Sequence, residues 1–299
     1  MTPETSSTGR GRGGKTALTI GVFDGVHRGH QALLAAAKAS DLPTTALTFD
    51  PHPAALLSLG RTPKLLGTLP ERRELLRSYG AEDVQVIAFD HAFAALTPDA
   101  FIEHLLRPLN PGFIVVGEDF RFGCERRGDV ETLRTAGLKV AVLPGVFVDG
   151  IPARSTVIRQ MLVGGQVTEA ARLLGRPYTL SGEVVHGREL GRTIGYPTAN
   201  LAPHTSLLVP AHGVYAGVAT LPDGRAVRTA ISIGTNPTVT ENGPLTVEAF
   251  LLDGFDEDLY GQKLTLAFVH FLRGTVKFDG LAPLLAQMAR DVARTAQLI

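Results

Sequence analysis

Two histidines, His27 and His30, stand three residues apart in a glycine-rich stretch at residues 21–30. The stretch follows an apolar run at residues 17–22, which predicts a strand, and precedes an Ala- and Leu-rich segment at residues 31–39, which predicts a helix. A helix N-terminus offers unpaired N–H groups and the positive end of the helix dipole to a phosphate. Both imidazoles would lie on one face of the first turn and donate to phosphoryl oxygens. The alternative is that they are ordinary loop and cap residues.

A second glycine-rich stretch, residues 182–201, contains Thr198 and Asn200 near its end, within the sequence Pro-Thr-Ala-Asn. Alternate residues of an extended chain point the same way, so both side chains are expected to face one site. A hydroxyl and an amide oxygen are hard ligands suited to Mg²⁺, which usually bridges substrate phosphates. On its own this short motif is equally compatible with an ordinary turn.

Glu248 is a third candidate, in a run at residues 246–252 that predicts a strand. Alternation puts it on a mixed face with Thr246 and Phe250, which suits a wall that contacts a ligand. The opposite face is uniformly apolar and is expected to face the core: Val247, Ala249 and Leu251. A carboxylate on the mixed face can accept a proton from a hydroxyl nucleophile. The alternative is a solvated strand residue.

Two segments leave predicted strands at their carboxyl ends, where open α/β sheets bind ligands. Residues 48–53 form a loop that two prolines stiffen, because proline fixes φ. Residues 117–123 carry Asp119, a carboxylate for sugar hydroxyls, together with Phe120 and Phe122, which are apolar faces for a ring system or else core residues.

Ser155 and Thr156 precede an apolar segment and predict an N-cap that opens a helix. Arg159 would then lie near the start of that helix. It is expected to be a phosphate partner, and the alternative is a solvated surface arginine.

The elements that must position these residues change character along the chain. Strands and helices alternate in the first half, which indicates βαβ units and a parallel sheet. The predicted strands there are residues 17–22, 44–49, 84–89, 113–116 and 139–143, and the helices are residues 31–39, 70–79, 99–106 and 130–136. The second half has short strands joined by turns, as in an antiparallel sandwich or barrel. These strands are residues 180–185, 214–220, 226–233, 246–252 and 263–268, followed by a helix with Leu281, Leu284, Leu285, Met288 and Val292 on one face.

Length and composition limit the number of domains and the classes of partner. The chain has 299 residues, which favours two domains, and its 29 basic and 29 acidic residues leave no net charge. That balance gives no electrostatic support for a nucleic-acid partner, and no apolar run is long enough for a membrane span. The single cysteine, Cys124, fits a reducing compartment, so a cytoplasmic location is expected. Residues 1–15 are polar and glycine-rich and are expected to be a disordered tail.

The motifs, taken in order, resemble those of the bacterial bifunctional riboflavin kinase/FAD synthetase family. The first half is similar to its adenylyltransferase part in Gly21-x-Phe23-Asp24-Gly25-x-His27-x-Gly29-His30-Gln31, Thr48-Phe49-Asp50-Pro51-His52-Pro53, Gly117-Glu118-Asp119-Phe120-Arg121-Phe122-Gly123 and Ser155-Thr156-x-Ile158-Arg159. The second half is similar to its kinase part in Pro197-Thr198-Ala199-Asn200, Gly213-Val214-Tyr215-Ala216, Ile233-Gly234-Thr235-Asn236-Pro237-Thr238, Val247-Glu248-Ala249, Asp258-Leu259-Tyr260-Gly261 and Lys277-Phe278.

This resemblance implies a doubly wound, nucleotidylyltransferase-like α/β domain over residues 16–178. It implies a small antiparallel β-barrel with a C-terminal helix over residues 179–299. Two reactions are implied: ATP-dependent phosphorylation of riboflavin to FMN, and adenylylation of FMN to FAD with release of pyrophosphate. Mg²⁺ and ATP would serve both, with no nucleic-acid or membrane partner, and an oligomer is compatible with the sequence.

The resemblance also implies a role for each matching residue. His27 and His30 would be catalytic in adenylyl transfer, and Glu248 would be the base in the kinase. ATP of the adenylyltransferase would meet Gly21, Phe23, Asp24, Gly29, Asp119, Ser155, Thr156 and Arg159. Its flavin would meet Asp50, His52, Pro53 and Phe120. In the kinase, ATP and Mg²⁺ would meet Gly187, Gly191, Thr198 and Asn200, with Thr198 and Asn200 as metal ligands and Arg273 on the flavin.

Several positions depart from the family's usual pattern: Arg154, Val157, Gln166, Phe250 and Thr275. They leave open that only one half is active and that the other is a flavin- or nucleotide-binding module. Synthesis of a different dinucleotide is disfavoured by the flavin-specific second half. A purely structural scaffold is disfavoured by the density of phosphate-site features.

Overall fold

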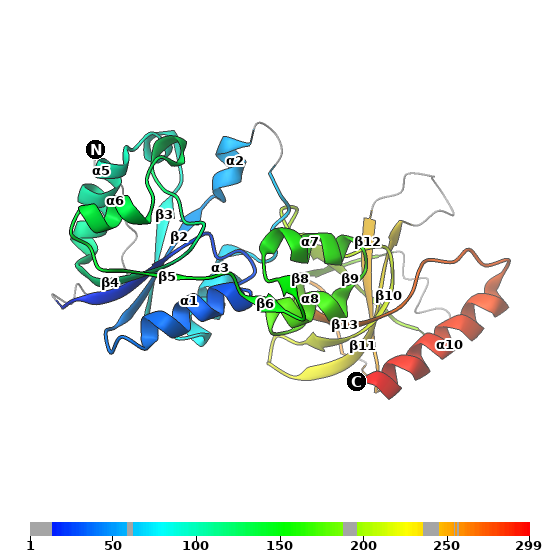
Figure 1. The fold of residues 1–299 in the computed structure, drawn as a ribbon. Coiled ribbons are helices and arrows are strands. Elements are labelled where there is room, and N and C mark those ends of the chain that lie inside the picture. The colour runs from blue at the N-terminus through cyan, green and yellow to red at the C-terminus, as the bar shows by residue number, and fades with distance from the viewer. Residues whose placement is uncertain (1–13, 59–61, 188–195, 236–244, 254, 256) are drawn as a thin grey trace. The chain divides into compact units, whose positions relative to one another are not determined.

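The structure is a computed structural model that describes residues 14–58, 62–187, 196–235, 245–253, 255 and 257–299. The chain divides into two compact units, residues 1–154 and 155–299 (Figure 1). Residues 155–178 therefore group with the second unit, whereas the sequence predicts a boundary at residue 178. Residues 1–13 of the predicted tail lie outside the described residues. Within the described part, no helix combines the length and apolarity that a membrane span requires.

The first unit is built on a five-stranded sheet in the order β3-β2-β1-β4-β5, in which all neighbouring strands are parallel. The strands are β1 (Thr16–Ile20), β2 (Thr44–Asp50), β3 (Asp83–Ala88), β4 (Pro111–Gly117) and β5 (Val140–Leu143). The winding direction reverses between β1 and β4, and open α/β sheets bind ligands outside the carboxyl ends of the strands at such a point. The predicted doubly wound α/β fold is confirmed.

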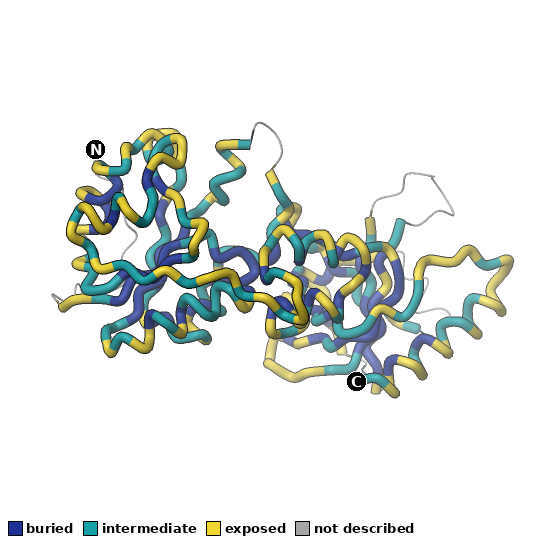
Figure 2. Tube along the Cα trace, viewed as in Figure 1, coloured by how far each residue is buried: buried dark blue, intermediate teal, exposed yellow. Residues whose placement is uncertain are grey.

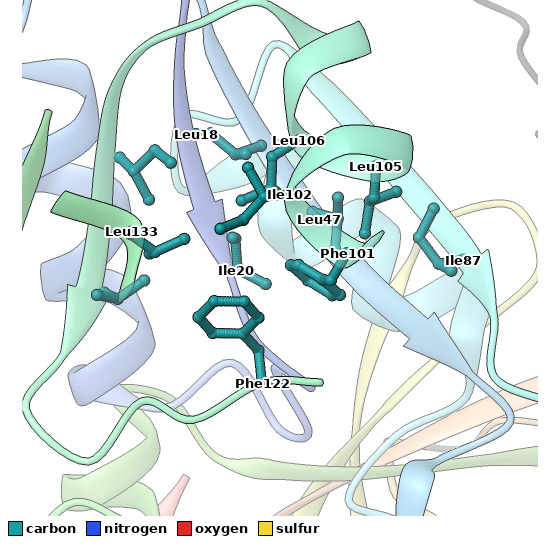
Figure 3. Packing of buried hydrophobic residues seen from close by; sticks show 12 residues of the cluster. Leu18, Ile20, Leu47, Ile87, Phe101, Ile102, Leu105, Leu106, Phe122 and Leu133 are labelled. Atoms are coloured by element: carbon teal, nitrogen blue, oxygen red, sulfur yellow. The ribbon is translucent and has the colours of Figure 1, made fainter. Parts of the chain in front are cut away.

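Helices cover both faces of this sheet. Ala46 and Leu47 are consecutive in β2 but belong to different hydrophobic clusters, so the two cores lie on opposite faces. One face packs on α1 (Arg28–Lys38) and α3 (Leu69–Ser78). The other packs on the cluster shown in Figure 3, which draws on α5 (Pro98–Phe101), the π-helical turn Ile102–Leu106 and α6 (Val130–Thr135). The shorter elements are α2 (Pro53–Leu57), α4 (His91–Ala94), β6 (Phe147–Val148), β7 (Ile151–Pro152) and the 3₁₀ turns Arg107–Leu109 and Cys124–Arg126.

The second unit contains a closed barrel with the strand order β10-β11-β12-β9-β8-β13. The strands are β8 (Tyr178–Val185), β9 (Ala199–Pro203), β10 (Gly213–Thr220), β11 (Ala226–Thr235), β12 (Leu245–Leu251) and β13 (Lys263–Arg273). All neighbours are antiparallel, which confirms the predicted barrel. The sequence pattern misses β9 and ends β13 too early, at Phe268. The pairing of β13 with β10 shifts register at two places, which breaks the alternation that predicts a strand.

Helices that precede and follow the barrel pack on its strands. α8 (Val167–Leu174) follows α7 (Ser155–Val163) and lies against β8 and β13, where Thr168 Oγ1 donates to the Val269 carbonyl over 3.0 Å. α10 (Leu281–Leu298) lies against β10, β11 and β13. Figure 2 shows that buried residues follow the strands in each unit, whereas much of α10 is exposed.

Candidate active sites

The histidine pair lies at the N-terminus of α1, directly after the loop that leaves β1. His27 is the N-cap residue and His30 lies in the first turn; their rings stack with centroids 3.7 Å apart. Gly29 permits this arrangement, because a Cβ there would come within 3.1 Å of the His27 ring. The Phe23 ring packs edge-on against His30 at 5.0 Å. Both imidazoles therefore share one face of the first turn, as the spacing predicts.

The loop between β1 and α1 is tightly packed. Gly21 leaves room for the Phe23 ring, which would lie 3.3 Å from a Cβ at that position. Phe23 is fully buried and has a φ of 53°, a strained backbone conformation for a residue other than glycine. Asp24 is also buried, and its Oδ1 accepts the Leu66 N–H over 2.9 Å. These three predicted ATP-binding residues thus shape the loop itself.

Burial and nearby charges disfavour the protonated form of His30. Burial lowers the pKa of His30 well below its usual value, and the nearby charges of His27 and Arg72 lower this pKa further. A neutral imidazole has one N–H to donate. His30 Nδ1 is buried and has no hydrogen-bond partner among the described residues.

Arg72 of α3 contacts the same loop and is missed by the sequence analysis. Its Nη1 donates to the Val22 carbonyl over 2.8 Å, and its Nη2 lies 3.5 Å from Asp50 Oδ1. The sequence does hold a signal for it, since Arg72 stands four residues before Leu76. Both therefore lie on the helix face that packs on the sheet, where both are buried.

The carboxyl end of β2 brings the predicted flavin-binding residues to the same edge of the sheet. Asp50 is the last residue of β2. His52 caps α2, because its Nδ1 accepts the Ala54 N–H over 3.1 Å, and Pro53 is the first helical residue. All three stand where a ligand of the sheet is expected.

The segment after β4 reaches this edge as well. Asp119 is exposed and lies 3.8 Å from the guanidinium of Arg154, one of the residues that depart from the family pattern. Phe120 is half-buried and stacks on Phe122 at 5.6 Å. Phe122 is only 6% exposed, so it is a core residue, and the interpretation of its ring as a ligand-binding face is wrong.

The remaining predicted ATP-binding residues, Ser155, Thr156 and Arg159, belong to the second compact unit. All three lie in α7, and Arg159 is half-buried. The helix begins at Ser155 itself, so Ser155 lies in the first turn rather than before it as an N-cap. Their part in ATP binding stays a prediction.

Strand register assembles the second site. Asn200 on β9 and Ser232 on β11 both stand directly opposite Glu248 on β12, so their side chains share one face of the barrel wall. Thr198, just before β9, places its Oγ1 3.4 Å from Glu248 Oε2. Ser232 is missed by the sequence analysis. The other face of β12 is buried, as predicted: Val247, Ala249 and Leu251.

This wall borders a cavity of about 980 Å³ in the second unit. Glu248, Asn200, Thr198 and Ser232 line it, and so do Phe250 and Thr275, two departures from the family pattern. α10 contributes apolar side chains to the lining of the same cavity: Leu284, Met288 and Val292. These side chains are only half-buried because they face a space instead of a packed core. The cavity is large enough for a multi-ring ligand.

A smaller cavity of about 250 Å³ shares Thr198 and Asn200 with the larger one. Gly187 packs on Asn200 so closely that a Cβ would fall 2.2 Å from Asn200 Nδ2. Glycine at this position therefore keeps the amide of Asn200 in place. Gly191, a predicted ATP-binding residue, lies outside the described residues.

Arg273 lines the larger cavity and makes an ion pair with Asp291 of α10, with Nη2 2.7 Å from Oδ2. Nε of Arg273 also donates to both carboxylate oxygens, and Gln287 Nε2 donates to Oδ1 over 2.8 Å. The side chains of the pair are 21% and 10% exposed. The predicted flavin-binding arginine thus holds α10 against the barrel through a residue that the sequence analysis misses.

Comparisons with known proteins match each half of the chain to a family. A family described as FAD synthetase matches residues 11–157, and a family described as riboflavin kinase matches residues 174–299. Bifunctional riboflavin kinase/FMN adenylyltransferases are similar over most of their length. The protein of Escherichia coli K12 is 39% identical over 92% of this chain and 90% of its own, and that of Listeria monocytogenes is 35% identical over 92% and 89%.

A solved structure supports the fold over nearly the whole chain. The crystal structure described as a macrolide-efflux protein from Streptococcus pneumoniae superposes with a TM-score of 0.86, at 31% identity and 95% coverage of both chains. The efflux activity in that description is said of that protein, and the comparison bears on the fold. The matches at both halves, together with the bifunctional relatives, show that this chain belongs to the bifunctional riboflavin kinase/FMN adenylyltransferase family.

Proposed function

We propose that the barrel unit phosphorylates riboflavin with ATP and that the sheet unit carries the transfer of AMP from a second ATP to FMN. The observation that carries this proposal is the position of Glu248. Its carboxylate stands beside Thr198 and Asn200 on the wall of a cavity of about 980 Å³. A proton acceptor is thereby next to two groups suited to a phosphate-bound cation.

In the kinase reaction, Glu248 accepts the proton of the terminal ribityl hydroxyl. The hydroxyl oxygen bonds to the γ-phosphorus of ATP as the bond to the ADP oxygen breaks. The isoalloxazine ring would lie in the larger cavity against the apolar side chains of α10, and the nucleotide would extend toward the smaller cavity. Thr198 and Asn200 border both cavities and so stand where the phosphates would pass.

The donor set near Glu248 fits Mg²⁺. No cluster of three or more His, Cys, Asp or Glu side chains suits a metal ion in the part of the chain that the structure describes. Thr198 and Asn200 instead supply hydroxyl and amide oxygens, which suit an ion that keeps several waters and binds phosphates. When bound there, Mg²⁺ would neutralise charge on the transferred phosphoryl group.

Adenylyl transfer needs no general base, because the FMN phosphate is already largely ionised at pH 7. One phosphate oxygen of FMN bonds to the α-phosphorus of ATP, and pyrophosphate leaves. His27 and His30 would donate hydrogen bonds to phosphoryl oxygens on which charge develops. The single cysteine is compatible with the reducing cytoplasm as the place of both reactions.

A product assay tests this proposal against the alternative in which one half only binds ligand. The purified chain is incubated with ATP and Mg²⁺ plus either riboflavin or FMN, and flavins are separated by chromatography. We expect riboflavin to yield FMN and then FAD, and supplied FMN to yield FAD. FMN as the end product from riboflavin would leave only the kinase active. FAD from FMN with no product from riboflavin would leave only the adenylyltransferase.

A further inference from the structure

Arg72 is a buried cation that the reaction described above does not use. Its side chain is 5% exposed, whereas its ion-pair partner Asp50 is 46% exposed. Its Nε is buried and has no hydrogen-bond partner among the described residues. A guanidinium buried with such incomplete compensation is costly for stability, and costly charges concentrate at functional sites.

The contacts of Arg72 lead to the histidine pair. Its Nη1 and the Thr48 hydroxyl both donate to the Val22 carbonyl, over 2.8 and 3.0 Å. That carbonyl directly precedes Phe23, whose strained φ of 53° persists only if its surroundings hold it. The Phe23 ring in turn packs edge-on against His30.

The other end of the guanidinium reaches the second ligand-facing loop. Asp50 closes β2 immediately before the segment that carries His52 and Pro53. Arg72 thus contacts both the loop after β1 and the end of β2, although it comes from neither. Removing the guanidinium would release both loops at once.

We propose that Arg72 is a positioning residue of the adenylyltransferase site, where it ties the Val22–Phe23 backbone to Asp50 and so fixes the ring of His30. This inference rests on the proposed role of His27 and His30 in adenylyl transfer. Arg72 acts through these neighbours and is not assigned a contact with substrate.

Charge supports the same role. The groups that face His30 are His27 and Arg72, and both lower its pKa. Asp24 and Asp50 face Arg72 and oppose the lowering of its pKa by burial, and arginine stays charged at all physiological pH values. Arg72 therefore helps to hold His30 neutral as well as in place.

The test uses the full-length chain with Arg72→Met, Arg72→Lys and a matched control, Arg77→Met, which lies exposed near the end of the same helix. FAD formation from FMN is measured as kcat and KM, and riboflavin phosphorylation serves as an internal control in each protein. The titration of His30 is followed by NMR of labelled histidine, with His30→Ala used to assign its signal.

We expect Arg72→Met to lower kcat for FAD formation by roughly 10- to 100-fold, the scale of loss when a catalytic group is misplaced. We expect Arg72→Lys to keep the low pKa of His30 but to lose part of kcat, because a single ammonium cannot span both contacts. In Arg72→Met the pKa of His30 should rise. Arg77→Met should match the unmodified chain in both reactions.

Each contrary outcome has a distinct meaning. A kcat within threefold of the unmodified chain in both Arg72 variants, or a His30 pKa unmoved in Arg72→Met, overturns the inference. If Arg72→Met does not fold, as judged by dispersion of the histidine signals, Arg72→Lys decides alone through its kcat. Undiminished FAD formation in His30→Ala would instead overturn the proposed role of the histidines.

Discussion

Glu248 faces Asn200 of the neighbouring strand and accepts a hydrogen bond from Thr198. Glu248→Gln keeps the size of the side chain and its hydrogen bonds but cannot accept a proton. We therefore expect riboflavin phosphorylation to fall by roughly 10²–10⁴-fold, the usual contribution of a general base. FAD formation from supplied FMN should not change, and both rates are measured by separating the flavin products.

A matched control for this substitution is Glu183→Gln, at an exposed position of the barrel strand β8. Both reactions should proceed there at the unmodified rate. A Glu248→Gln protein that makes FMN within threefold of the unmodified rate would remove Glu248 from the mechanism.

His30 makes the stability of the first unit depend on pH. Its pKa is lowered in the folded chain, so between the ordinary histidine pKa of about 6.5 and the folded value the unfolded chain binds more protons. The free energy of unfolding should therefore fall as pH drops below about 6.5. Thermal unfolding at pH 7.5 and 5.5 checks this, and the drop should be smaller in His30→Gln. An equal drop in both proteins would assign the pH dependence to other groups.

At the scale of elements, α10 is held at its buried side by a polar contact rather than by apolar packing. The residues of α10 that are buried are Asp291 and Thr295, whereas its apolar face borders the larger cavity. We therefore expect the position of that apolar wall, and hence the shape of the proposed flavin cavity, to depend on the pair between Asp291 and Arg273.

Asp291→Asn should consequently weaken riboflavin binding. A hydrogen bond to a charged group is worth about 1.5–3 kcal/mol, which corresponds to roughly a 10- to 100-fold rise in KM for riboflavin. Steady-state kinetics of the kinase measures this, with Asp279→Asn, exposed just before α10, as the control. An unchanged KM would show that α10 keeps its position without the ion pair.

The elements differ in how well the sequence predicts them, for physical reasons. Continuous apolar runs and alternation predict nearly all strands of the sheet and barrel. A strand buried on both faces needs apolar residues throughout, and a strand buried on one face needs them at every second position. β9 is missed because it has only five residues, includes Asn200 and Pro203, and follows a glycine-rich stretch. The end of β13 is missed because its bulges interrupt the alternation.

The site residues also differ in whether the sequence predicts them. The family resemblance implies that Glu248, Thr198 and Asn200 serve one site, and the strand register of the structure brings them together. It does not predict Arg72 or Asp291, because each acts through a contact with a segment distant in sequence. Such partners become visible only when helix and sheet are packed.

At the scale of the whole molecule, the two compact units raise the question of where α7 and α8 belong. The sequence predicts a boundary at residue 178, but α8 lies against β8 and β13 and forms the bond from Thr168 to Val269. Its inner face is buried: Val167, Ala170, Leu173 and Leu174. A fully buried valine or leucine side chain contributes about 1.5–3 kcal/mol to the free energy of unfolding. Loss of α8 would therefore remove much of the stability of a small domain, which is about 5–15 kcal/mol.

A fragment of residues 155–299 should therefore fold and phosphorylate riboflavin, whereas a fragment of residues 179–299 should unfold at a much lower temperature. Circular dichroism during heating measures the two transitions, and the FMN product measures activity. This expected loss of stability does not involve the first unit, because α8 packs on β8 and β13, which are strands of the barrel. If residues 179–299 proved as stable and as active as residues 155–299, α7 and α8 would be dispensable to the barrel. The boundary at residue 178 would then describe the folding units better than the division at residue 154.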